Sequence, residues 1–143
     1  MRLYFDTAYV AKCYLNEPDG KNVRKFARRA DGLYSSSWCI AELACVFQRH
    51  VREKSITPDE AAKLRHIFLE DVRNSVWILF PVSERLLYQV ELLVGGLPRT
   101  AYLRAGDAIH LVSAKDAGFQ EIWTNDRRLL EAAQYFDMAG KSV

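Results

Sequence analysis

The chain has 143 residues, the size of one ordinary domain, and half of them are hydrophobic, so we expect a single domain over residues 1–143. The net charge of +2 is too small to indicate nucleic-acid binding by itself, and no apolar run approaches the length of a membrane span. Asp6 comes too early for a secretory signal peptide, so we expect a cytoplasmic protein. The three cysteines have no CxxC spacing, which argues against a disulfide framework and structural zinc.

Short apolar runs alternate with longer amphipathic stretches in the first half of the chain. Residues 2–5 are apolar on both faces, which is typical of a buried parallel strand. Thr57 is a strong helix cap because Pro58 and Glu60 follow it, and Ser37 is another expected cap. The predicted elements are a strand at 2–5, helices at 8–16 and 21–30, a strand at 33–36, and helices at 38–52 and 58–73.

The second half of the chain continues the alternation. Ser83 is expected to cap a helix that ends at Gly95-Gly96, and Asn125 or Asp126 is expected to cap the last helix. Strands joined by helical crossovers indicate an α/β fold with a parallel sheet between helices. The predicted elements are strands at 76–80 and 121–124, helices at 84–95, 104–118 and 127–135, and a short strand near 138.

Four carboxylates lie in apolar surroundings, where an ionised acid is costly unless something pairs with it. Asp6 ends the first strand, and Asp126 follows the fourth. Asp107 opens an apolar helix, and Glu42 lies inside another. Ligands of open parallel sheets bind outside the carboxyl ends of the strands. Asp6 and Asp126 are therefore expected at the same edge, and the four acids together predict one site.

Glu42 carries the sharpest local argument. Residues three and four positions away are its neighbours on a helix. None of these neighbours is charged or a strong hydrogen-bond partner; they are Trp38, Cys39, Cys45 and Val46. The apolar setting predicts a semi-buried carboxylate that is kept for a purpose.

A cluster of carboxylates favours a bound cation. At about 4 Å and an effective dielectric constant of roughly 20, each pair of charges costs on the order of 4 kcal/mol. An all-oxygen site suits Mg²⁺ or Mn²⁺ better than Zn²⁺. Such ions can align a water for in-line attack on a phosphodiester, which predicts a metal-dependent hydrolase.

Each acid also has a structural explanation when it is taken alone. Asp6 and Asp126 would cap the helices that follow them, and Asp107 would pair with Arg104 one turn earlier. His110 lies on an apolar helix, where a satisfied core residue is commoner than a metal ligand. The force of the argument lies in the four acids occurring together.

Two arginines are candidates for contacts with a polynucleotide backbone. Arg49 lies two turns beyond Glu42 on a similar helix face, and Arg127 directly follows Asp126. Arginine side chains commonly contact phosphates. The other basic residues are expected on solvated helix faces.

Four segments carry a family resemblance, and they are Tyr4-Phe5-Asp6-Thr7, Ala41-Glu42-Leu43, the run from Leu103 to Leu111 and the run from Thr124 to Leu129. In order and spacing they resemble the PIN-domain nucleases, especially VapC-type toxins, over nearly the whole chain. The resemblance implies a Rossmann-like three-layer α/β/α sandwich with a central parallel sheet. It also implies Mg²⁺- or Mn²⁺-dependent ribonuclease activity.

The resemblance assigns roles to residues of this sequence. It makes Asp6, Glu42, Asp107 and Asp126 the metal-binding acids of the catalytic site. Thr124 matches a hydroxyl residue that often stands beside the last acid, where it would orient water or a carboxylate. The resemblance also implies an RNA substrate, a homodimer, and a cognate antitoxin whose C-terminal segment enters the active-site groove.

Two features depart from the family pattern. Asn125 precedes Asp126, where some relatives have a second acid, and this predicts a weaker second metal site. The connector from Gly95 to Leu103 has no family motif, and we expect it to shape substrate access.

Three functional hypotheses remain. The first is an endoribonuclease that acts as the toxin of a type II toxin–antitoxin pair. The second is a non-catalytic PIN-like module that holds RNA or a protein. The third is a phosphoryl-transfer domain with Asp6 as nucleophile, which is weak because position 8 is Ala and the second Asp of that pattern is missing.

Overall fold

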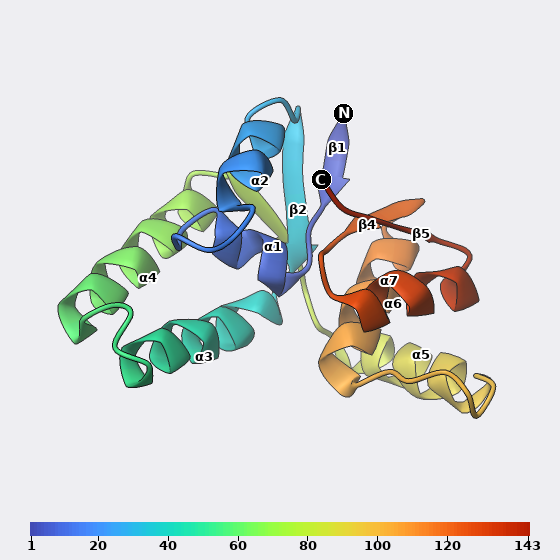
Figure 1. Ribbon diagram of the computed structural model, residues 1–143. Helices are drawn as coiled ribbons and strands as arrows, with labels where there is room; N and C mark the ends of the chain where they lie inside the picture. Colours follow the sequence, from blue (N-terminus) through green and yellow to red (C-terminus); the bar gives the residue numbers. More distant parts are fainter.

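Seven α-helices and five short strands alternate along the chain in the computed structural model, which describes residues 1–143 (Figure 1). The strands are β1 (Arg2–Tyr4), β2 (Gly32–Ser36), β3 (Trp77–Phe80), β4 (Glu121–Trp123) and β5 (Ala139–Lys141). The helices are α1 (Thr7–Lys12), α2 (Gly20–Ala27), α3 (Cys39–Arg52), α4 (Pro58–Arg73), α5 (Glu84–Gly95), α6 (Ala105–Asp116), α7 (Arg127–Ala132) and the short 3₁₀ helix η1 (Ala133–Phe136).

The strands form one parallel arrangement in the order β3-β2-β1-β4-β5. β1 pairs with β2, and β2 with β3, while β4 pairs with β5. A parallel bridge between Phe5 and Trp123 joins the two groups, and the Asp6 amide donates to the Trp123 carbonyl at 3.2 Å. All five strands therefore point the same way, and their carboxyl ends lie at one edge.

Two cores lie on opposite faces of the sheet because successive side chains of a strand alternate between faces. Leu3 and Phe5 pack into a core with residues of α1, α2, α3 and α4. Tyr4, between them, packs into a second core with α5, α6, α7 and η1. Figure 1 shows these two helical layers on either side of the strands. The expected three-layer sandwich is confirmed.

The predicted elements are present, with ends that differ by a few residues. Thr57 forms the complete capping box with Glu60, and Ser83 caps α5 by accepting a hydrogen bond from the Leu86 amide. The Ser37 cap was wrong, since α3 begins at Cys39 and no side chain caps it. Instead, the Ser37 hydroxyl accepts from the Val82 amide at 3.1 Å and ties the segment after β3 to the start of α3. No helix is long and apolar enough to span a membrane.

Candidate active site

A cavity of about 700 Å³ lies at the carboxyl edge of the sheet. Asp6, Glu42, Asp107 and Asp126 all line it. They come from the end of β1, the first turn of α3, the first turn of α6 and the cap of α7. The structure therefore brings the four acids predicted from the sequence to one cavity.

Asp6 is the most buried of the four acids, with 5% of its surface exposed. It caps α1, because its Oδ1 accepts from the Tyr9 amide at 3.0 Å. Its Oδ2 accepts from the Thr124 hydroxyl at 2.5 Å. Burial raises the pKa of Asp6 to about 6, against the opposing effects of His110 and of the Thr124 hydrogen bond. Ionisation of Asp6 is therefore unfavourable in this site, and a nearby cation would stabilise the ionised form.

Thr124 connects two of the acids. Its fully buried hydroxyl donates to Asp6 and accepts from the Asp126 amide at 3.0 Å. Asp126 in turn caps α7, with its Oδ1 accepting from the Arg128 amide at 2.9 Å. The short segment after β4 is thereby held in one conformation, which fixes the position of Asp126 relative to Asp6.

Glu42 has polar partners that its helix neighbours do not supply. Its Oε1 accepts from the Thr7 hydroxyl at 2.7 Å and lies 2.8 Å from His110 Nε2. The other ring nitrogen of His110 lies 3.1 Å from the Tyr4 hydroxyl. Burial raises the pKa of Glu42, but His110 and Thr7 outweigh it, so the net shift is downward. Glu42 is half-buried, as its apolar helix neighbours predicted, and its partners lie far away in sequence.

The environment of Asp107 differs from that of Glu42, because it raises the pKa of the carboxyl group. Its Oδ2 is buried and makes no hydrogen bond. The nearest positive group is Arg104, whose Nε lies 3.7 Å away, too far for a hydrogen bond. Burial and then the charge of Asp126 raise the pKa of Asp107, while Arg104 lowers it. A buried oxygen without a partner is costly, and it is the feature that a bound cation would relieve.

Gly106 allows α6 to approach α3 at the cavity. A Cβ at this position would lie 2.8 Å from Glu42 Oε2 and 3.2 Å from Trp38 Nε1. Sequence reasoning singled out Asp107 and passed over the glycine before it. Only the three-dimensional contact reveals its role, since glycine in a first helical turn has no fixed meaning by itself.

The basic residues near the cavity divide into two groups. Arg49 lines the cavity, as does Arg104, which the sequence indicated only as a salt-bridge partner. Arg127 does not line the cavity; its side chain is 91% exposed and pairs with Glu131 at 3.2 Å. Thr7 and His110 also line the cavity. Neither was predicted as a site residue, because the acid that both contact, Glu42, lies far from them in sequence.

The chemistry of the cavity fits a hard divalent cation. Its acidic donors are carboxylate oxygens, and the buried Asp107 Oδ2 has no other partner. No three His, Cys, Asp or Glu side chains are placed so that together they could hold a metal ion as they stand. Mg²⁺ commonly keeps several waters and takes only one or two carboxylates from the protein, so the donor set still suits it.

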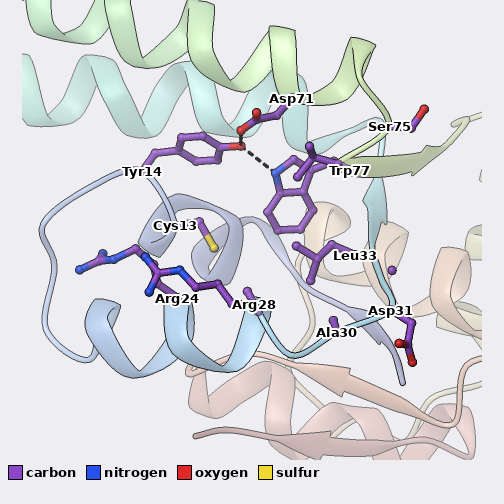
Figure 2. Close-up of a pocket in the computed structure, with 13 residues that line it drawn as sticks. Cys13, Tyr14, Arg24, Arg28, Ala30, Asp31, Leu33, Asp71, Ser75 and Trp77 are labelled. Carbon is purple, nitrogen blue, oxygen red and sulfur yellow. Dashed lines mark hydrogen bonds between the residues drawn. The ribbon is translucent and has the colours of Figure 1, made fainter.

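A second cavity, of about 480 Å³, lies near the amino ends of β2 and β3 (Figure 2). Figure 2 shows the Tyr14 hydroxyl between Asp71 and the Trp77 indole. It donates to Asp71 Oδ2 at 2.6 Å and accepts from Trp77 Nε1 at 2.7 Å. Burial raises the pKa of the Cys13 thiol in this cavity to about 12, so it is not a thiolate nucleophile.

The sequence matches the PIN domain family over residues 3–135, which is most of the chain. This chain belongs to the PIN domain family. Among curated proteins, none matches its sequence significantly.

Solved structures share this PIN domain fold at low sequence identity. VapC20 of Mycobacterium tuberculosis, a toxin that cleaves the sarcin-ricin loop, has a TM-score of 0.70 at 14% identity over 91% of this chain and 94% of its own. VapBC2 of Rickettsia felis, bound to a DNA fragment from its promoter, has a TM-score of 0.69 at 17% identity over 100% and 99%. FitAcB of Neisseria gonorrhoeae has a TM-score of 0.63 at 16% identity over 98% and 96%. These similarities bear on the fold.

Proposed function

We propose that this PIN domain is a divalent-cation-dependent endoribonuclease and the toxin of a toxin–antitoxin pair. The observation that carries the proposal is the meeting of four acids from four elements in one cavity, one of them with a buried oxygen that makes no hydrogen bond. Membership of the PIN domain family supports nuclease chemistry. The shared fold with VapC20, a sarcin-ricin loop cleaving toxin, supports RNA as the substrate.

The four acids divide the work in this proposal. Asp6 and Asp107 are the primary ligands of a Mg²⁺ or Mn²⁺ ion, because burial leaves both carboxylates in need of positive charge. The ion, when bound, polarises the phosphodiester and lowers the pKa of a water. Glu42 is kept ionised by His110, and its Oε2, which carries no hydrogen bond, is free to accept a proton from water. Asp126 is the fourth acid of this group and lines the same cavity.

The neutral and basic groups orient these acids and the substrate. Thr124 restrains the Asp6 carboxylate through its hydrogen bond, and Thr7 does the same for Glu42. Arg49 lies on the rim with a half-exposed side chain, where it can contact a phosphate of a polynucleotide. Arg127, which lies outside the cavity, would contact only a flanking part of the RNA.

The test is cleavage of a ribosomal RNA fragment by metal-stripped protein with Mg²⁺, with Mn²⁺ or with a chelator. We expect cleavage only with the cation, and a loss of about 10²- to 10³-fold in the Asp6→Asn and Asp107→Asn variants. Asp137→Asn is the matched control, since Asp137 is highly exposed, pairs with Lys115 and lies outside the cavity. Wild-type cleavage rates in folded Asp6→Asn protein would overturn the proposal.

The absence of three prearranged ligands favours one rival, a non-catalytic module that binds RNA or protein. A cation titration monitored by thermal unfolding separates the two functions. The nuclease should gain stability with Mn²⁺ in proportion to the logarithm of its concentration, and Asp107→Asn should reduce the gain. A non-catalytic module should show little gain in either protein.

The partners belong to the same proposal. We infer a cognate antitoxin that blocks the cavity, and a homodimer in the active state; the fold shared with VapBC2 supports the first. Expression of the chain with and without its neighbouring open reading frame tests the antitoxin, when the ends of cleaved RNA are mapped in both cases. Light scattering of the purified protein tests the dimer.

A further inference from the structure

The main chain of Arg104 is fixed by α6, whereas its side chain makes no hydrogen bond. It occupies the cap position of α6 with an extended backbone, and its carbonyl accepts from the Ala108 amide at 3.0 Å. The side chain is 64% exposed, yet it lines the acidic cavity. The helix therefore fixes the position of the Arg104 main chain, whereas the side chain can turn between the cavity and solvent.

The contacts of the Arg104 guanidinium are loose. Its Nε lies 3.7 Å from Asp107 Oδ2, and its Nη2 lies 3.9 Å from Asp126 Oδ2. Neither contact is a hydrogen bond, whereas a hydrogen-bonded arginine–carboxylate pair has N–O distances of about 2.7–2.9 Å. Arg104 thus supplies charge to two acids without the geometry that would hold it there.

The other charged side chains that line the cavity have partners other than Asp107 and Asp126. Glu42 is paired with His110, and Arg49 is paired with Glu53 at 4.0 Å. Glu17 lies 3.6 Å from Lys12 and 3.1 Å from His50. Arg104 is consequently the one basic side chain that pairs with Asp107 and Asp126.

We propose that Arg104 is an exchangeable counter-charge, which pairs with Asp107 and Asp126 in the cation-free protein and turns to a phosphate of the RNA when a divalent cation takes these carboxylates. The proposal rests on the nuclease function for its second half only. A bound cation would neutralise the two acids and so would remove the attraction that holds the guanidinium over them. A phosphodiester then offers the planar oxygen pair that a guanidinium binds best.

The first half predicts that Arg104 opposes cation binding. Isothermal titration calorimetry with Mn²⁺, without RNA, should give a dissociation constant about 1.5- to fivefold lower for Arg104→Gln than for the wild type, the range set by measured exposed ion pairs. Arg104→Lys keeps the charge and should remain near the wild type. Arg99→Gln is the matched control, because Arg99 is an exposed arginine of the preceding connector that does not line the cavity.

The second half predicts a phosphate contact. Cleavage kinetics at saturating Mn²⁺ should show a raised KM for Arg104→Gln with a smaller change in kcat. RNA binding at saturating Mn²⁺ in a Glu42→Gln background, which keeps the proposed cation ligands Asp6 and Asp107, should show that Arg104→Gln lowers the slope of log K against log salt by about 0.7, the value for one phosphate contact with single-stranded RNA. Arg99→Gln should leave the slope unchanged.

Two results separate this inference from the proposed function. A cation-dependent nuclease whose Arg104→Gln variant has wild-type Mn²⁺ affinity and an unchanged salt slope would overturn the role of Arg104 alone. A protein that cleaves no RNA but binds Mn²⁺ more tightly after Arg104→Gln would overturn the nuclease and uphold the counter-charge. Thermal unfolding of each variant excludes misfolding as the cause.

Discussion

Asp107 and Asp71 each line a cavity of this protein, but the two carboxylates are satisfied in different ways. Asp71 accepts a 2.6 Å hydrogen bond from Tyr14, whose hydroxyl also holds the Trp77 indole (Figure 2). Asp107 has a buried oxygen with no hydrogen bond and only a distant guanidinium. We call the cavity lined by Asp71 the closed cavity, because this carboxylate is hydrogen-bonded, and the cavity lined by Asp107 the open cavity, because a buried oxygen of this carboxylate is not. A missing partner, more than burial, marks the site that needs a ligand.

The largest expected effect concerns Asp6, in the open cavity. Its pKa is raised by burial from 3.8 to about 6, so the unfolded chain releases this proton at a lower pH than the folded chain. Between these values each rise in pH therefore destabilises the fold, by up to about 3 kcal/mol over the window. Asn at this position can still accept from the Tyr9 amide and can donate to Thr124, so Asp6→Asn should be the more stable protein at pH 7.5 without cation.

Urea unfolding in chelator measures this difference. The free energies of unfolding of wild type and Asp6→Asn should converge below about pH 3, where Asp6 is protonated in both the folded and the unfolded chain, and differ most above about pH 6. Asp137→Asn, in the exposed control position, should follow the wild type at each pH. Parallel profiles for Asp6→Asn and wild type would show that the open cavity does not strain the acid.

A smaller effect is expected where α6 meets α3. Gly106→Ala places a methyl group 2.8 Å from Glu42 Oε2, so the carboxylate must move. Because misplacing a reacting group by about 1 Å can cost about 10²-fold, we expect RNA cleavage to fall by about 10- to 100-fold while the fold survives. Gly95→Ala is the matched control, since nothing lies within 4 Å of a Cβ at Gly95. Equal cleavage rates in the two variants would remove Gly106 from the site.

The sequence predicted the order of elements better than it predicted the partners of the acids. Apolar runs and caps such as Thr57 are local signals, so they could be interpreted from neighbours alone. Glu42 depends on Thr7 and His110, which lie 35 and 68 positions away, and no local pattern connects them. The wrong Ser37 cap has the same origin, because its hydroxyl serves the distant Val82 amide. Thr124 was found only because the family resemblance pointed to it.

The smallest effect is expected in the closed cavity. Tyr14→Phe removes the hydrogen bond to Asp71 and leaves the buried Trp77 indole N–H without a partner. The free energy of unfolding should fall by about 1–2 kcal/mol, whereas cleavage per folded molecule should stay at the wild-type rate, because the Tyr14 hydroxyl contacts no residue of the acidic cavity. Urea unfolding and RNA cleavage of the same preparation measure both quantities. If cleavage fell together with stability, the two cavities would be coupled through α1, which carries Thr7 at its first residue and ends two residues before Tyr14.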